Sequence, residues 1–153
     1  MLAAGTRVPD VGALDQDEKP VTLRAFGGHP LVVYFYPRAD TPGCTAETQA
    51  FRDLQPEFAK AGAAIVGVSR DTVADQKKFA QKYGVKFPLL ADTSSAICDA
   101  FGVIVEKNMY GKKSIGIQRS TFLIGSDGTI AKEWPRVSVE GHAAAVLEAL
   151  RSL

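Results

Sequence analysis

The sequence has 153 residues, of which 46% are hydrophobic, and its formal net charge is +1. Such a composition excludes a disordered chain and argues against a large basic surface for nucleic acid. No apolar run approaches the roughly 18 residues of a membrane helix, and the first residues lack the pattern of a secretory signal. We therefore expect a single domain over 1–153, cytoplasmic, that binds neither nucleic acid nor membrane.

The first half of the chain begins with small strands and turns and then alternates strand and helix patterns. The apolar run LVVYFYP at 31–37 predicts a central strand buried on both faces. A helical pattern follows from about 44 to 60, and Pro56 is expected to kink or divide it. The same alternation continues with a strand at 63–69, a helix at 71–84, a strand at 87–92 and a short helix at 93–102.

The last third of the chain predicts a loop, a hairpin and a closing helix. Lys107, Met109 and Tyr110 are placed in the loop. The segment 120–134 has a Ser-Asp-Gly turn between two β-rich runs, which indicates a hairpin. Residues 138–153 form an amphipathic pattern in which His142 is expected at the surface. Strands that alternate with helices, followed by a hairpin, favour an α/β fold with a mixed sheet of the thioredoxin-like kind.

Cys44 is the residue on which a chemical function would depend. The chain has two cysteines and two histidines, without CxxC or HxxxH spacing, so no structural zinc site is expected. Cys44 lies in PRADTPGCTAETQ, where a buried strand ends in a loop and a helix begins. A helix N-terminus favours the reactive thiolate form of a cysteine. The alternative, a small buried side chain without chemistry, stays open on these residues alone.

Several segments resemble the peroxiredoxin family, and within it the bacterioferritin comigratory protein or peroxiredoxin Q subfamily. The active-site pattern PxxxTxxC matches Pro37, Thr41 and Cys44. The similarity continues over nearly the whole chain, including GVSRD, KKFAQKYGVKFPLLAD, MYGKKSIGIQRSTFLI and VEGHAAAVLEAL. It implies a thioredoxin-like fold, with a central mixed sheet flanked by helices and an N-terminal β-hairpin, and reduction of hydrogen peroxide and organic hydroperoxides.

The resemblance also implies a role for each site residue. Cys44 is the thiolate that attacks the peroxide and becomes a sulfenic acid. Thr41 holds the peroxide, and Arg119 stabilises the thiolate and the charge on the leaving oxygen. Pro37 shields the site from water, and Glu47 orients Arg119. Neither a metal nor an organic cofactor is implied.

One departure from the subfamily concerns the second thiol. Many members carry a resolving cysteine five residues after the first, and here that position is Gln49. Cys98 is the internal candidate for a resolving cysteine, and a buried structural thiol is the alternative. Without it, a thioredoxin, a glutaredoxin or a small thiol would reduce Cys44 directly.

Two other functions remain open at this stage. The first is a peroxide-sensing thiol switch without efficient turnover, and the second is a disulfide reductase, against which the absence of CxxC argues. We expect a monomer, because no extra arm or exposed apolar strand is evident.

Overall fold

A seven-stranded mixed sheet forms the centre of the computed structural model, which describes residues 1–153 except for the side chain of Met109. Its strand order is β2-β1-β5-β4-β3-β8-β9. The strands are β1 (Gly12–Leu14), β2 (Pro20–Thr22), β3 (Leu31–Phe35), β4 (Ala64–Ser69), β5 (Leu89–Ala91), β8 (Ser120–Ile124) and β9 (Ile130–Trp134). The three central strands β3, β4 and β5 are parallel, and the outer strands pair antiparallel. The expected N-terminal hairpin is β1–β2.

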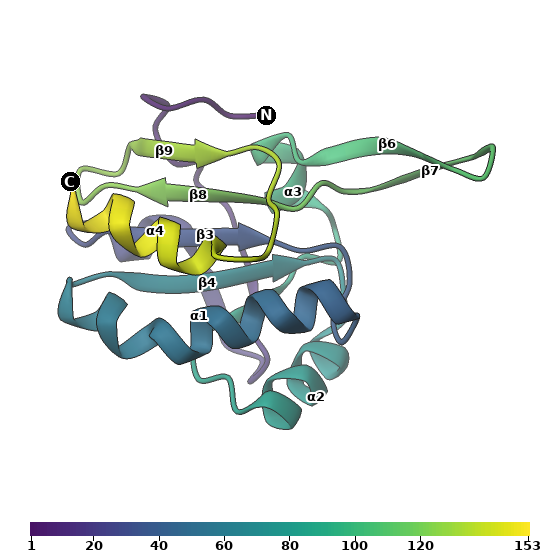
Figure 1. The fold of residues 1–153 in the computed structure, drawn as a ribbon, viewed down its shortest axis with the longest axis horizontal. Coiled ribbons are helices and arrows are strands. Elements are labelled where there is room, and N and C mark those ends of the chain that lie inside the picture. Colours follow the sequence, from purple (N-terminus) through teal and green to yellow (C-terminus); the bar gives the residue numbers. More distant parts are fainter.

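Helices cover both faces of this sheet (Figure 1). One face carries α1 (Pro42–Lys60), α2 (Val73–Tyr83) and α4 (His142–Arg151), and the other carries α3 (Ala96–Phe101) and the 3-10 helix η1 (Leu23–Phe26). Strand β3 is buried throughout because its alternate side chains serve two separate cores. Tyr34 packs in the core beneath α1, while Val33 and Phe35 pack in the core beneath α3.

Local signals place the helix ends close to their predicted positions. The Thr72 hydroxyl accepts a hydrogen bond from the Asp75 amide and so caps α2, which ends at Gly84 in the left-handed conformation. Helix α1 begins at Pro42, two residues before the expected start, because proline suits the first helical position. It continues through Pro56 to Lys60 as one element, so of the two expected effects of Pro56, a kink or a division, the division does not occur. None of the described helices is long and apolar enough to cross a membrane.

The loop predicted around Lys107 and Tyr110 is instead a second, two-stranded sheet. Strands β6 (Ile104–Met109) and β7 (Lys112–Ile117) form an antiparallel hairpin that projects from the body of the molecule (Figure 1). Tyr110 and Gly111 connect the strands, and both have positive φ, at 53° and 77°. A two-residue turn of this hand matches the twist of the strands, but tyrosine is not a usual residue for it. The local signal for a hairpin is therefore weak here.

The expectation that His142 lies at the surface is also wrong. His142 is only 6% exposed. Its ring packs edge-on against Phe51 and Trp134, and its Nε2 lies 2.8 Å from the hydroxyl of Thr121. Burial, with a smaller effect from the nearby charge of Arg119, lowers the pKa of His142 to about 4. His142, the first residue of α4, is therefore part of the core, and its lowered pKa favours the uncharged imidazole near neutral pH.

His142 should make the folded state sensitive to acid. Its pKa falls from 6.5 to about 4 on folding, so its contribution to stability is present above pH 6.5 and is lost as the pH falls towards 4. Between pH 7.5 and 4.5, the wild type should lose about 2 kcal/mol of unfolding free energy relative to His142→Phe. Urea unfolding of both proteins at each pH measures this. A difference in unfolding free energy between the two proteins that does not change with pH would contradict the lowered pKa of His142.

Candidate active site

Strand pairing brings together the two residues at the centre of the site. Strand β8 pairs antiparallel with β3 in a register that sets Ser120 opposite Phe35. Arg119 directly precedes Ser120, and Cys44 lies in the first turn of α1, shortly after the end of β3. The pairing therefore places an arginine beside a cysteine that lies 75 residues away in the sequence.

The Arg119 guanidinium forms two contacts that define the site. Its Nη2 donates to Cys44 Sγ at 3.4 Å, and its Nη1 donates to Glu47 Oε1 at 2.9 Å. Cys44 is fully buried, the Glu47 side chain is 1% exposed and the Arg119 side chain is 17% exposed. A fixed positive charge in a poorly solvated place stabilises a thiolate and negative charge that develops near it.

Glu47 is a buried carboxyl group with only one of its oxygens hydrogen-bonded among the described residues, since Oε2 has no partner. Burial raises the pKa of Glu47 to about 7, and the attraction of Arg119 offsets only part of this. The contribution of Glu47 to stability is therefore present below pH 4.5 and is lost as the pH rises through 7. The contribution of Glu47 to the unfolding free energy falls as the pH rises, whereas that of His142 increases. The two contributions therefore oppose each other between pH 4.5 and 6.5.

Pro37 and Thr41 bound the loop between β3 and α1. Thr41 is the N-cap residue of α1, and its hydroxyl donates to the Arg38 carbonyl at 2.8 Å, so it neither caps the helix nor donates to Cys44. The hydroxyl oxygen keeps lone pairs that can accept a hydrogen bond from a ligand. The first-turn amides have no helical partner, and Pro42 has no amide hydrogen, so Gly43 and Cys44 supply the donors at this helix end.

Two aspartates outside the predicted site hold this loop in place. Asp71 accepts a hydrogen bond from the Ala39 amide at 2.8 Å and another from the Ser69 hydroxyl at 2.6 Å. Asp40 accepts from the Tyr83 hydroxyl at 2.6 Å and forms an ion pair with Lys82 at 2.9 Å. Strand β4 and helix α2 thus fix the backbone that precedes Cys44. Asp71 is the last residue of the GVSRD segment, so the role of that segment is to support the loop.

Gly43 allows Arg119 to approach the helix. A Cβ atom added to Gly43 would lie 3.0 Å from Arg119 Nη2, which is closer than nearly all such contacts in proteins. Any larger side chain at this position would therefore require the guanidinium to shift from its present place. Sequence reasoning missed Gly43 as a site residue, because glycine is common in loops and no local pattern shows that an arginine packs against it.

Cys98 does not share a core with Cys44. The Cys98 side chain is buried in the core beneath α3, whereas Cys44 belongs to the core beneath α1, on the opposite face of the sheet. Burial raises the pKa of Cys98 well above its usual value, and Asp92 raises it further. Both effects favour the protonated and less nucleophilic form of the Cys98 thiol. Both cysteines are free.

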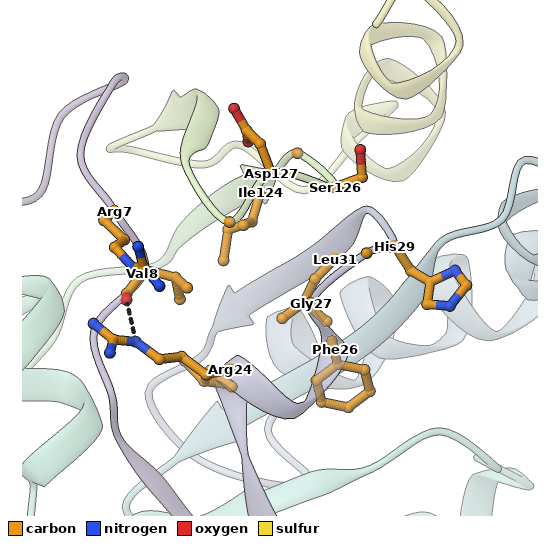
Figure 2. A pocket seen from close by; sticks show the side chains of 14 residues that line it. Arg7, Val8, Arg24, Phe26, Gly27, His29, Leu31, Ile124, Ser126 and Asp127 are labelled. Atoms are coloured by element: carbon orange, nitrogen blue, oxygen red, sulfur yellow. Dashed lines mark hydrogen bonds between the residues drawn. The ribbon is translucent and has the colours of Figure 1, made fainter.

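The molecule also has a cavity away from this site, shown in Figure 2. It has a volume of about 210 Å³ and is lined in part by Arg7, Val8, Arg24 and Leu31. Arg24 Nε donates to the Val8 carbonyl at 3.1 Å across one side of it. Leu31 begins β3, whereas Cys44 follows its far end, so the cavity is not part of the Cys44 site. The described residues contain no group of three or more His, Cys, Asp or Glu that could hold a metal ion.

Comparisons with known proteins show the family to which the chain belongs. A model of the AhpC/TSA family matches residues 4–133. Peroxiredoxin Bcp of Xanthomonas campestris is 56% identical over 131 residues, which cover 86% of this chain and 82% of that protein. Peroxiredoxin Bcp of Bacillus subtilis is 40% identical, over 99% of this chain and 97% of that protein.

The chain belongs to the AhpC/TSA family, the peroxiredoxins. Among solved structures, peroxiredoxin Q of Xanthomonas campestris has a TM-score of 0.92 at 50% identity and covers 97% of both chains. A structure concerned with the alkyl peroxide reduction activity of the bacterioferritin comigratory protein of that organism has a TM-score of 0.92 at 49% identity, over 98% of both chains. The thioredoxin-like fold and the subfamily resemblance are thereby confirmed.

Gly43→Ala should separate stability from reactivity in this peroxiredoxin. The added methyl group displaces Arg119 Nη2 from Cys44, while alanine suits a helix better than glycine. We expect the rate at which hydrogen peroxide consumes the Cys44 thiol to fall about 10-fold, with unfolding free energy unchanged or slightly higher. Stopped-flow thiol loss and urea unfolding measure the two quantities. An unchanged rate would show that Arg119 tolerates the methyl group.

Proposed function

We propose that this peroxiredoxin is a thiol-dependent peroxidase that reduces hydrogen peroxide and organic hydroperoxides through a sulfenic acid at Cys44. The observation that carries the proposal is the contact of Arg119 Nη2 with the fully buried Cys44 Sγ at 3.4 Å. The activity of the Xanthomonas campestris relative on alkyl peroxides supports organic hydroperoxides as substrates.

In the oxidative step, the Cys44 thiolate attacks one oxygen of the peroxide. A sulfur–oxygen bond forms and the oxygen–oxygen bond breaks, so that sulfur is oxidised and an alkoxide or hydroxide leaves and takes a proton. Arg119 stabilises the negative charge as it moves from sulfur to the leaving oxygen. The Thr41 hydroxyl accepts a hydrogen bond from the peroxide, and the amides at the start of α1 donate to it.

In the proposed mechanism Glu47 and Pro37 do not contact the peroxide but shape the environment of Cys44 and Arg119. The bond from Arg119 Nη1 to Glu47 Oε1 leaves Nη2 directed at sulfur and fixes the plane of the guanidinium. Pro37 is partly buried between the end of β3 and the helix start, where it limits the access of water to the thiolate. Both residues are therefore positioning residues in the proposed mechanism.

We propose that the second thiol comes from outside the chain. Gln49 occupies the position of the resolving cysteine, and Cys98 lies in the core on the other face of the sheet. A Cys44–Cys98 disulfide would require one thiol to leave its core and pass around the sheet. An external thiolate instead attacks the sulfenic acid, water leaves, and a second thiol then releases Cys44 from the mixed disulfide. Thioredoxin, a glutaredoxin or a small thiol would supply this external thiol. We further propose that the protein acts as a monomer in the cytoplasm.

The first experiment is intact-mass analysis with thiol alkylation after one equivalent of hydrogen peroxide, for the wild type and Cys98→Ser. The proposal predicts a gain of about 16 mass units at Cys44, with Cys98 still reduced. It also predicts equal peroxide turnover by the two proteins with an external thiol.

Other outcomes would revise the proposal at different points. A loss of about two mass units with a Cys44–Cys98 peptide would make Cys98 the resolving residue. No change at Cys44 would remove the peroxidase function. Oxidation of Cys44 without sustained peroxide consumption would favour the thiol switch.

A further inference from the structure

We propose that the cavity in Figure 2 is a binding site for a small aromatic monocarboxylate. The cavity lies at the end of the sheet opposite to Cys44, since Leu31 in its lining begins β3 and Cys44 follows the far end of that strand. The inference is independent of the proposed peroxidase function, because none of the residues that line the cavity belongs to the Cys44 site.

Hydrogen bonds between distant segments hold the walls of the cavity together. The Val8 amide, ahead of β1, donates to the Gly128 carbonyl in the turn between β8 and β9 at 2.8 Å. The Gly28 amide, in the loop after η1, donates to the Ser126 carbonyl of the same turn at 3.0 Å. Arg24 Nε in η1 donates to the Val8 carbonyl at 3.1 Å. The cavity is therefore formed before a ligand arrives, and binding does not require the walls to become ordered first.

The buried part of the lining is apolar. Four aliphatic side chains from different elements contribute to it, and each is at most 4% exposed: Val8, Leu23, Leu31 and Ile124. The cavity has a volume of about 210 Å³. An apolar cavity of about 150 Å³ is known to hold benzene. The space is therefore sufficient for a six-membered ring that carries one small substituent.

Two arginines supply positive charge at one edge of this cavity. Arg7 directly precedes Val8, and Arg24 is bonded to the Val8 carbonyl, so both side chains lie on the same side of the cavity (Figure 2). Neither arginine forms an ion pair with a carboxylate in the described part of the chain. Their combined charge attracts an anion, and a guanidinium presents paired N–H donors that match the two oxygens of a carboxylate.

Asp127 is the only acidic residue in the lining, and its carboxylate is engaged within its own turn. The Thr129 amide donates to Asp127 Oδ1 at 3.0 Å, and the Thr129 hydroxyl donates to the same oxygen at 2.9 Å. These hydrogen bonds lower the pKa of Asp127. An anionic ligand therefore has no acidic side chain to displace from the two arginines, and a cationic ligand finds no free carboxylate in the lining.

The two parts of the cavity require two features in one ligand. The apolar lining favours a compact ring, and the arginines favour a carboxylate at one end of it. Acetate has the charge without the ring, and a neutral ring has no charge for the arginines. Benzoate combines both features and is the simplest probe. For a ligand of about nine non-hydrogen atoms we expect a Kd of about 1 mM.

The test is an NMR titration of the isotope-labelled reduced protein with benzoate, benzamide and acetate. The backbone amides of Gly28 and Gly128, which line the cavity, report on binding there. The amide of Gly43, which lies against Arg119, reports on binding at the Cys44 site. Benzamide keeps the ring and the shape of benzoate without its charge, and acetate keeps the charge without the ring.

Three variants examine the contribution of the arginines. Arg7→Gln and Arg24→Gln each remove one positive charge from the edge of the cavity. The matched control is Arg70→Gln, because Arg70 is exposed and does not line the cavity. Arg24→Gln also removes the hydrogen bond to the Val8 carbonyl, so Arg7→Gln is the cleaner measure of charge.

We expect benzoate to shift the Gly28 and Gly128 signals to saturation and to leave Gly43 unchanged. Benzamide and acetate should each bind about 10-fold more weakly than benzoate. Arg7→Gln and Arg24→Gln should each weaken benzoate about 5-fold without a further loss for benzamide, and Arg70→Gln should bind as the wild type does. Raising salt from about 0.02 M to about 0.5 M should weaken benzoate more than benzamide.

Four results would overturn the inference. The absence of saturable shifts at Gly28 and Gly128 would show that the cavity takes no such ligand, and shifts confined to Gly43 would place benzoate beside Cys44. Equal affinity for benzoate and benzamide would remove the role of the arginines. An equal loss in Arg70→Gln would assign the effect to the net charge of the protein. None of these results depends on peroxide reduction, so the peroxidase function is tested separately.

Discussion

The pairing of β8 with β3 is the constraint on which the site depends. Each strand is fully buried, and the register between them is set by side chains that alternate between two cores. A slip of one residue would exchange the faces of every side chain in β8 and would carry Arg119 away from Cys44. The large apolar area that fixes this register thus also fixes a polar contact of 3.4 Å. Stability of the sheet and reactivity of the thiol have one structural origin.

The same sheet separates the two thiols of the chain. The Cys44 thiol contacts an arginine and lies at a helix start, whereas the thiol of Cys98 is surrounded by apolar groups and lies near Asp92. The two cysteines thus have opposite surroundings, although both are buried, and this difference supports the different roles proposed for them. Burial alone therefore does not decide whether a cysteine reacts. The charged groups in contact with it decide.

Much of the fold was predictable because its strongest patterns are local. The apolar run of β3, the helix at 71–84 and the turn before β9 depend on neighbouring residues, and all three elements are present where they were predicted. The hairpin β6–β7 was missed because its strands mix lysines with β-branched residues and face solvent. His142 was misplaced because its core neighbour Phe51 comes from α1, far away in the sequence. The role of Gly43 depends on Arg119, which no local pattern brings close.

The separation of Cys44 and Arg119 in the chain has a consequence for how the protein is made. A ribosome synthesises Cys44 first, and Arg119 follows 75 residues later. Until β8 joins β3, the cysteine has neither its arginine nor the closed sheet around it, so the nascent chain carries an ordinary thiol. The contact with Arg119 that the proposed reaction requires arises only on completion of the fold. In the proposed mechanism, folding of the last strands is therefore the step that completes the site.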